Sequence, residues 1–326
     1  MRPDVTDQLG TRLAAVLRPA LGDDVVVENV QLLTGGASRT TRSFDAVTGQ
    51  GRRALILRTA PIAEHCAGME REAAAQAAAA RAGAPVPQVL AASDSAAALG
   101  DPYLICEEIA GQTIVRRIQR RLDDEGRSRL LTQCAQALTA IHRASTDLPG
   151  LVRQDQLSEY RLRLDEMAYT TATFEWAFRW LADHRPALGT LRMVHGDYRM
   201  GNLIVNGSVL AAVLDWELVH IGEHYEDLAW FCIRAWRFGA PAEMSAGGLG
   251  TIEEFVSAYE QAGGDPVDRV TLRWWLVLAT LRWGVICRAQ AERHLSGQCP
   301  SVELAAIGRR VCETEWDIIE LLESSS

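Results

Sequence analysis

The spacing of hydrophobic residues changes about a third of the way along the chain. Up to Ile109, short apolar runs are mostly separated by glycine or proline turns, which is typical of β-strands. From Gly111 onward, apolar residues recur mainly every three or four positions, which is typical of amphipathic helices. Strands gathered in one part of a sequence and helices in the rest predict an α+β fold.

The first part of the chain is predicted to contain an opening helix, five strands and one inserted helix. Apolar residues at helical spacing indicate the opening helix over residues 5–21. An alanine-rich stretch over residues 69–82, followed by two prolines, predicts the inserted helix. The strands are predicted at residues 25–33, 42–47, 54–58, 88–92 and 103–109.

The rest of the chain is predicted to be mainly helical, with short strands and turns over residues 191–215. A chain of 326 residues is longer than the roughly 250–300 residues at which single hydrophobic cores stop growing. We therefore expect two lobes, and a cleft between lobes is a common ligand site. The helices are predicted around residues 130–141, 157–184, 251–263 and 265–294, and from residue 301 onward.

The charge balance excludes several classes of function. The chain has 33 basic and 42 acidic residues, a net charge of −9, and every basic residue is arginine. Without lysine it cannot form a lysine Schiff base or a phosphate-binding loop that ends in lysine. An acidic chain also lacks the basic surface that nucleic acids require, so we expect no nucleic-acid partner.

Cysteine usage and hydropathy predict a cytoplasmic protein. The seven cysteines are scattered and form no C-x-x-C pair, which argues against a disulfide framework and a structural zinc site. The most apolar run, residues 274–281, is far shorter than the ~20 residues that a bilayer requires. The N-terminus has no apolar signal core. We therefore expect no membrane partner.

The strongest functional signal is the spacing of three oxygen-bearing side chains. Asn202 follows Asp197 by five residues, and Asp215 follows it by eighteen. Phosphoryl transfer requires a carboxylate that orients the attacking hydroxyl, together with oxygen ligands for Mg²⁺. Asp197 suits the first role, and Asn202 and Asp215 suit the second.

A tight hairpin is expected to bring two of these side chains together. Asn206-Gly207 between two apolar runs is a strong signal for a two-residue hairpin loop. A strict register would pair Asn202 with Ala211 and leave Asp215 roughly 13 Å further along. The strand must therefore bend or bulge after Ala211 if Asn202 and Asp215 are to hold one metal ion.

These motifs resemble those of the aminoglycoside phosphotransferase and choline-kinase-like family, small-molecule relatives of protein kinases. The segment from His195 to Asn202 is most similar to phosphotransferases fused to, or encoded near, acyl-CoA dehydrogenases. The resemblance implies a two-lobed protein-kinase-like fold with a small antiparallel-sheet lobe and a larger helical lobe. It assigns nucleotide binding to residues 1–108, and catalysis and substrate binding to residues 109–326. The motifs that carry it are His195-Gly196-Asp197 with Asn202, and Asp215-Trp216-Glu217.

The resemblance also implies a nucleotide site in the first lobe. Gly35, Gly36 and Ser38 would belong to the loop that covers the nucleotide, where glycine lets backbone N–H groups approach phosphate. Arg58 would replace the phosphate-contacting lysine of most relatives and would pair with Glu72. Without the downstream motifs, the same residues would also suit an ordinary hairpin turn and a surface ion pair.

Further roles follow from the resemblance at the hinge between the lobes and near Asp197. Backbone groups of Glu107 and Ile109 are expected to contact the adenine ring. Arg199 is expected to act with Asp197 in catalysis by contacting the γ-phosphate or an anionic part of the substrate; a structural ion pair is the alternative. Asp227 is expected to brace the catalytic loop.

We therefore predict a Mg²⁺-dependent phosphotransferase that moves the γ-phosphoryl group of ATP, or of GTP, to a hydroxyl of a small molecule. A hydroxy acid or hydroxyacyl-CoA is the preferred acceptor, because Arg199 suits an anion and the similar subgroup is associated with dehydrogenases. An aminoglycoside is the alternative, because acidic residues outnumber arginines over residues 217–265. A non-catalytic nucleotide-binding relative is a further alternative, suggested by Arg58 in place of lysine.

A second motif points to different chemistry. His220, Glu223 and His224 match the H-x-x-E-H pattern of some zinc peptidases. That chemistry needs both histidines on one face of a stable helix, and Gly222 between them disfavours a helix. We therefore do not expect zinc to bind there.

Overall fold

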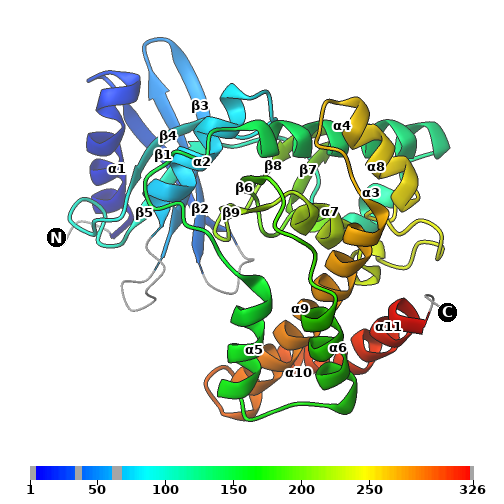
Figure 1. The fold of residues 1–326 in the computed structure, drawn as a ribbon. Helices are drawn as coiled ribbons and strands as arrows, with labels where there is room; N and C mark the ends of the chain where they lie inside the picture. The colour runs from blue at the N-terminus through cyan, green and yellow to red at the C-terminus, as the bar shows by residue number, and fades with distance from the viewer. Residues whose placement is uncertain (1–4, 34–38, 61–67, 324–326) are drawn as a thin grey trace.

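The computed structural model describes residues 5–33, 39–60 and 68–323 of the chain. In these residues a β-sheet with two helices forms a smaller lobe, and helices with short strands form a larger one (Figure 1). This arrangement confirms the two-lobed α+β fold predicted from the sequence.

The smaller lobe is built on a five-stranded antiparallel sheet in the order β1-β2-β3-β5-β4. Helix α1 precedes the sheet in sequence, and α2 is inserted between β3 and β4. All five predicted strands and both predicted helices are present. The bounds are α1 Val5–Leu21, β1 Val26–Leu33, β2 Thr40–Thr48, β3 Gly51–Thr59, α2 Met69–Arg81, β4 Val89–Ser93 and β5 Tyr103–Glu107.

Alternating side chains of the sheet enter two small cores on opposite faces. Leu55 and Leu57 of β3 belong to the core that contains Leu13 of α1. Ile56, between them in sequence, packs against the core that contains Met69 of α2. Successive side chains of a strand point to opposite faces of the sheet, so each strand serves both cores.

The larger lobe is organised around α9, which contacts α5, α6, α7, α10 and α11. Two short antiparallel strand pairs, β6 with β9 and β7 with β8, lie between this lobe's helices and the sheet (Figure 1). The bounds are α3 Val115–Gln119, α4 Asp124–Arg143, α5 Gln156–Glu166, α6 Ala172–Asp183, β6 Leu191–Val194, η1 Met200–Asn202, β7 Leu203–Asn206, β8 Val209–Val213, β9 His220–Glu223, α7 Tyr225–Cys232, η2 Arg234–Arg237, α8 Ile252–Gln261, α9 Arg269–Leu295, α10 Val302–Gly308 and α11 Val311–Glu323.

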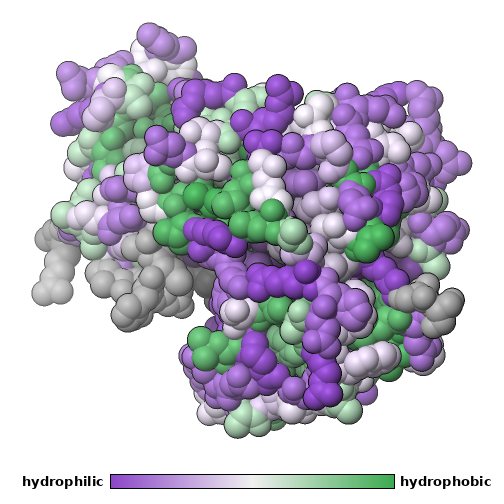
Figure 2. Space-filling view, viewed as in Figure 1, coloured by the Kyte–Doolittle hydropathy of each residue, from purple (hydrophilic) through white to green (hydrophobic). Residues whose placement is uncertain are grey.

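Among the described helices, α9 alone has the length and apolar composition to cross a membrane. The apolar window of α9 is 67% buried inside the molecule, as expected for the core helix of a globular lobe. Trp274, Leu281 and Val285 are among its buried side chains. Figure 2 shows hydrophilic residues over most of the visible face, with the apolar residues in separate patches.

Two stretches that we predicted as single helices are each divided in two. Residues 157–184 contain α5 and α6, because Ala168 takes a left-handed backbone conformation with φ 46°. The Thr171 hydroxyl then accepts a hydrogen bond from the Phe174 N–H and caps α6. The helix expected from Ser301 onward is likewise divided into α10 and α11. Apolar spacing alone does not reveal such breaks when the next helix continues the same pattern.

Candidate active site

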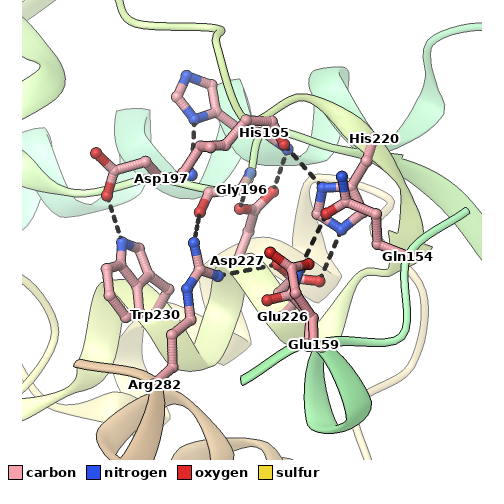
Figure 3. Close-up of polar contacts among 12 residues, drawn as sticks. Gln154, Glu159, His195, Gly196, Asp197, His220, Glu226, Asp227, Trp230 and Arg282 are labelled. Carbon is pink, nitrogen blue, oxygen red and sulfur yellow. Dashed lines mark hydrogen bonds and ion pairs between the residues drawn. The ribbon is translucent and has the colours of Figure 1, made fainter. Parts of the chain in front are cut away.

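The segment that carries Asp197 follows β6, and a buried aspartate fixes its backbone through hydrogen bonds. Asp227 of α7 accepts hydrogen bonds from the backbone N–H groups of His195 at 2.7 Å and Gly196 at 2.9 Å (Figure 3). Burial raises the pKa of Asp227, but hydrogen bonds from His142 and the His195 backbone bring the pKa below its ordinary value. The ionised carboxylate therefore braces the loop, as predicted.

Arg282 of α9 supports the same loop, and the sequence analysis missed it. Its guanidinium donates to the Gly196 carbonyl at 2.5 Å and to Glu226 at 3.0 Å, and it lies 4.2 Å from the Trp230 ring centroid (Figure 3). Only 3% of Arg282 is exposed. A buried charge is tolerated only when it is paired with other groups. An arginine in the most apolar helix therefore indicated that its guanidinium has buried partners.

Asp197, Arg199 and Asn202 lie in direct contact. One carboxylate oxygen of Asp197 accepts a hydrogen bond from Asn202 Nδ2 at 2.7 Å, and the other accepts one from Trp230 Nε1 at 2.7 Å. Arg199 Nε lies 3.0 and 3.1 Å from these two oxygens. Asn202 Nδ2 also donates to the Asp197 carbonyl at 3.0 Å, which leaves the Asn202 side-chain oxygen for another partner. Trp230 is a second contact that the sequence analysis did not predict.

Strands β7 and β8 form the predicted hairpin, with a bulge at Ala211, next to the position after Ala211 where we predicted one. The two-residue loop begins at Gly207, one residue later than expected. The register then shifts at Ala211, which has no partner across the ladder. As a result the Leu214 N–H donates to the Asn202 carbonyl at 2.8 Å. Asp215 therefore lies one residue beyond the position opposite Asn202.

His195 joins the two halves of this cluster. Its Nε2 lies 3.0 Å from the Leu214 carbonyl, and its Nδ1 accepts a hydrogen bond from the Asp197 N–H at 3.2 Å. Asp215 itself has a left-handed backbone with φ 66°. Few residues other than glycine take this conformation, although aspartate and asparagine do so more readily than most. Such strain is concentrated at functional sites, where the surroundings hold it in place.

Two arginines of the smaller lobe share the acidic groups at this site. Arg58 donates to Asp215 Oδ1 at 2.9 Å and lies 3.5 Å from Glu72. Glu72, which is fully buried, is bound much more tightly by Arg39, through contacts of 2.6 and 2.8 Å to its two oxygens. Arg39 also lies 3.4 Å from Glu217. The predicted pairing of Arg58 with Glu72 is therefore present at 3.5 Å, but the sequence analysis missed Arg39 as the closer partner of Glu72 and Asp215 as the closer partner of Arg58.

Other predicted nucleotide contacts lie apart from this cluster or outside the described residues. Gly35, Gly36 and Ser38 fall in residues 34–38, which the structure does not describe. The Glu107 N–H donates to the Gln88 carbonyl at 3.0 Å, and its carboxylate pairs with Arg53 at 2.6 Å. Strand β5 ends at Glu107, so Ile109 lies in the connection that follows rather than in the strand.

The H-x-x-E-H motif does not form a zinc-binding helix. His220 lies in β9, and His224 precedes the first residue of α7. His220 Nε2 is taken by Glu226 at 2.9 Å (Figure 3). In the part of the chain that the structure describes, no group of three histidine, cysteine or acidic side chains is arranged to hold a metal ion.

One buried histidine near the loop, His224, should make the protein sensitive to acid. Burial lowers the pKa of His224 to about 4, whereas an unfolded histidine titrates near 6.5. Between these pH values the unfolded chain binds the extra proton, so this side chain has no effect on stability above pH 6.5 and destabilises the fold progressively below it, by about 2 kcal/mol at pH 5.

We therefore expect His224→Phe to reduce the loss of stability between pH 7.5 and pH 5 by about 2 kcal/mol. Urea unfolding at the two pH values measures this difference. His184→Phe is the matched control, because His184 is exposed and should leave the loss unchanged. An equal loss in wild type and His224→Phe would contradict the prediction.

Comparison with known proteins identifies relatives of this arrangement. The model of a family described as "Phosphotransferase enzyme family" matches residues 29–275. Mouse acyl-CoA dehydrogenase family member 10 is 26% identical over 291 residues, which cover 81% of this chain and 27% of the mouse protein. The chain spans only 27–39% of the length of the first three curated relatives it matches.

Solved structures show the same fold over nearly the whole chain. A Ralstonia eutropha protein, provisionally described as an aminoglycoside phosphotransferase, superposes with a TM-score of 0.79 at 21% identity and covers 97% of this chain and 98% of its own. Aminoglycoside phosphotransferase APH(4)-Ia, in a complex with AMP-PNP and hygromycin B, superposes with a TM-score of 0.61 at 17% identity, with coverages of 97% and 99%. At these identities the likeness concerns the fold.

Proposed function

The chain belongs to the phosphotransferase enzyme family, and from this we propose that it transfers the γ-phosphoryl group of ATP to a hydroxyl of a small molecule. The single observation that carries the proposal is the contact between Asp197 and Asn202 beside the bulged hairpin that ends at Asp215. In this proposal residues 1–108 bind the nucleotide and residues 109–326 supply catalysis and the acceptor site. GTP is the alternative donor.

The donor atoms near Asp215 fit Mg²⁺. The Asn202 side-chain nitrogen donates hydrogen bonds to Asp197, so its side-chain oxygen is left to bind a metal ion. Asp215 supplies a carboxylate. Amide and carboxylate oxygens are the ligands that Mg²⁺ prefers, usually together with water and substrate phosphates. When bound, Mg²⁺ would neutralise phosphate charge. We therefore propose Asn202 and Asp215 as the residues that hold it.

The chain's own residues supply the remaining steps. Asp197 orients the acceptor hydroxyl and accepts its proton, since its carboxylate is fixed by donors on both oxygens and is partly open to solvent. The Arg58 guanidinium contacts Asp215. Because its side chain is 18% exposed, it can turn from Asp215 to the phosphates of the nucleotide. Arg199, which is 26% exposed, stands beside Asp197 to meet the transferred phosphoryl group or an anionic acceptor.

We favour an anionic acceptor, such as a hydroxy acid or hydroxyacyl-CoA, over an aminoglycoside. Three of the acids that suggested a pocket for a polycation are engaged within the protein. Asp227 binds the catalytic loop, Glu254 caps α8, and Asp265 pairs with Arg192 at 2.7 Å. The naming of the mouse relative as an acyl-CoA dehydrogenase family member is in keeping with an acyl-CoA acceptor.

A thermal-shift experiment tests the nucleotide part of the proposal. AMP-PNP with Mg²⁺ at about 100 times its Kd should stabilise the folded protein by about 2.7 kcal/mol, and EDTA should remove most of that effect. Asp215→Asn should lose the Mg²⁺-dependent part, whereas Asp165→Asn, on the exposed surface of α5, should retain it. No stabilisation by AMP-PNP or by a guanine analogue would overturn the proposal.

Turnover separates the acceptor classes. ATP consumption with Mg²⁺ should appear with hydroxyacyl-CoA or hydroxy acids and not with kanamycin or hygromycin B. The opposite pattern would identify an aminoglycoside phosphotransferase. Nucleotide binding without ATP consumption across the whole panel would favour a non-catalytic relative and contradict the proposed activity.

A further inference from the structure

A cavity of about 460 Å³ lies between α3, η2, α9 and the start of α11. A second cavity of about 480 Å³ shares part of its wall and adds two more arginines, Arg120 just after α3 and Arg127 of α4. The first cavity is lined by four arginines and two acids, although the chain as a whole carries a net charge of −9. The charged and aromatic lining residues are Arg116, Arg234, Arg237, Arg310, Glu313, Asp317, Trp283 and Phe238.

Two of the four arginines are neutralised within the protein, and two are not. Arg234 pairs with Asp317 at 2.8 Å, and Arg310 pairs with Glu313 at 3.1 Å. Arg116 and Arg237 form no ion pair with any other residue that the structure describes. A guanidinium offers a planar set of N–H donors that matches the oxygens of phosphate or carboxylate. The uncompensated charge therefore favours an oxyanion in this cavity.

An aromatic wall connects the cavity with Asp197. The Trp283 ring, which lines the cavity, lies 4.7 Å from Trp236 and 6.4 Å from Trp230, measured between ring centroids. Trp230 donates to Asp197, and the Arg199 guanidinium lies 4.9 Å from the Trp236 ring centroid. Trp230 and Trp236 are only 2% and 5% exposed, so the wall is a packed layer of rings, and one side chain, Trp230, separates Trp283 at the cavity from the catalytic carboxylate.

The same wall contains two polar groups that the described residues leave unsatisfied. The indole nitrogens of Trp236 and Trp283 are buried and have no hydrogen-bond partner in the structure described. A buried N–H without a partner destabilises the folded protein, because it has lost its hydrogen bond to water. Most buried polar groups in native proteins do have a partner. A bound molecule or water would supply one here.

We propose that this cavity binds an oxyanionic group of the acceptor while the acceptor's hydroxyl lies at Asp197. The inference rests on the proposed function, because it assigns the cavity to the substrate of that reaction. It narrows the acceptor to molecules that carry a phosphate or carboxylate at a distance from the reacting hydroxyl. It also excludes polycations, since Arg116 and Arg237 would repel them.

Isothermal titration with inorganic pyrophosphate tests this site, with AMP-PNP and Mg²⁺ held at saturation so that the nucleotide site is filled. The double variant R116Q/R237Q should bind pyrophosphate at least about tenfold more weakly than wild type. R117Q is the matched control, because Arg117 is the next residue of α3 and lines neither cavity. Succinate in a parallel titration identifies the anion, because tighter succinate binding would mark a carboxylate and tighter pyrophosphate binding a phosphate.

Binding of both pyrophosphate and succinate that is equal in wild type and R116Q/R237Q, or absent from both, would overturn the inference. Circular dichroism and thermal melting of each variant show whether it is folded. AMP-PNP binding without pyrophosphate binding would reject the cavity and leave the proposed function standing. Arginine-dependent pyrophosphate binding with no nucleotide binding would reject the proposed function and the acceptor role together.

Discussion

Replacing Asp197 with asparagine should lower kcat about 10³-fold, within the 10²–10⁴ range that general acid–base catalysis contributes. Asparagine has nearly the same shape and keeps an oxygen for the Trp230 indole. Its NH2 group cannot accept the hydrogen bond from Asn202 Nδ2, but Asn202 still donates to the backbone carbonyl of residue 197, so the loop should hold its place. It cannot accept the proton of the acceptor hydroxyl. The affinity for Mg²⁺-nucleotide should change little, because the proposed metal ligands are Asn202 and Asp215.

Steady-state kinetics with the best acceptor, together with AMP-PNP titration, measure both quantities. Asp124→Asn controls for the loss of one negative charge, since that side chain is 95% exposed on α4. Trp230→Phe separates positioning from chemistry, because it removes one donor to Asp197 and should cost much less than the loss of the carboxylate. Full activity in Asp197→Asn would show that another group accepts the proton.

The elements that surround this site were predictable because their signals are local. Short apolar runs between glycine or proline turns gave the strands of the sheet, and Asn206-Gly207 between two apolar runs gave the hairpin. Even the bulge at Ala211 followed from geometry, because two ligands of one ion must lie close together. The loop position was wrong by one residue, because Gly207-Ser208 also suits a two-residue loop, with glycine at its first position and a positive φ of 64°.

The contacts that the sequence did not reveal join residues far apart in the chain. Trp230 and Arg282 reach the catalytic segment from α7 and α9, and Arg39 reaches Glu72 from the start of β2. No periodicity or cap marks such contacts. These contacts depend on how the helices and strands pack together. The whole hydrophobic core determines that packing, and residues adjacent in sequence do not.

Arg39 gives the second large prediction, which concerns stability. The Arg39 side chain is 7% exposed, and Glu72 is fully buried against it. Burial lowers the pKa of Arg39, but the hydrogen bond and charge of Glu72 raise the pKa above its ordinary value. Removal of one partner of a buried ion pair leaves an uncompensated charge and typically costs 3–5 kcal/mol. Arg39→Met should therefore destabilise the fold by about 3–5 kcal/mol.

Urea unfolding of Arg39→Met, Arg58→Met and the double variant Arg39→Met/Glu72→Met measures the separate roles of the two arginines. Arg58 contacts Asp215, which is 32% exposed, so its loss should cost at most about 1 kcal/mol of stability and should instead weaken nucleotide binding. The double variant should recover much of the loss, because it removes the unpaired buried carboxylate as well. If Arg58→Met were the more destabilising change, Arg58 would be the structural partner of Glu72, and Arg39 would be free to contact phosphate.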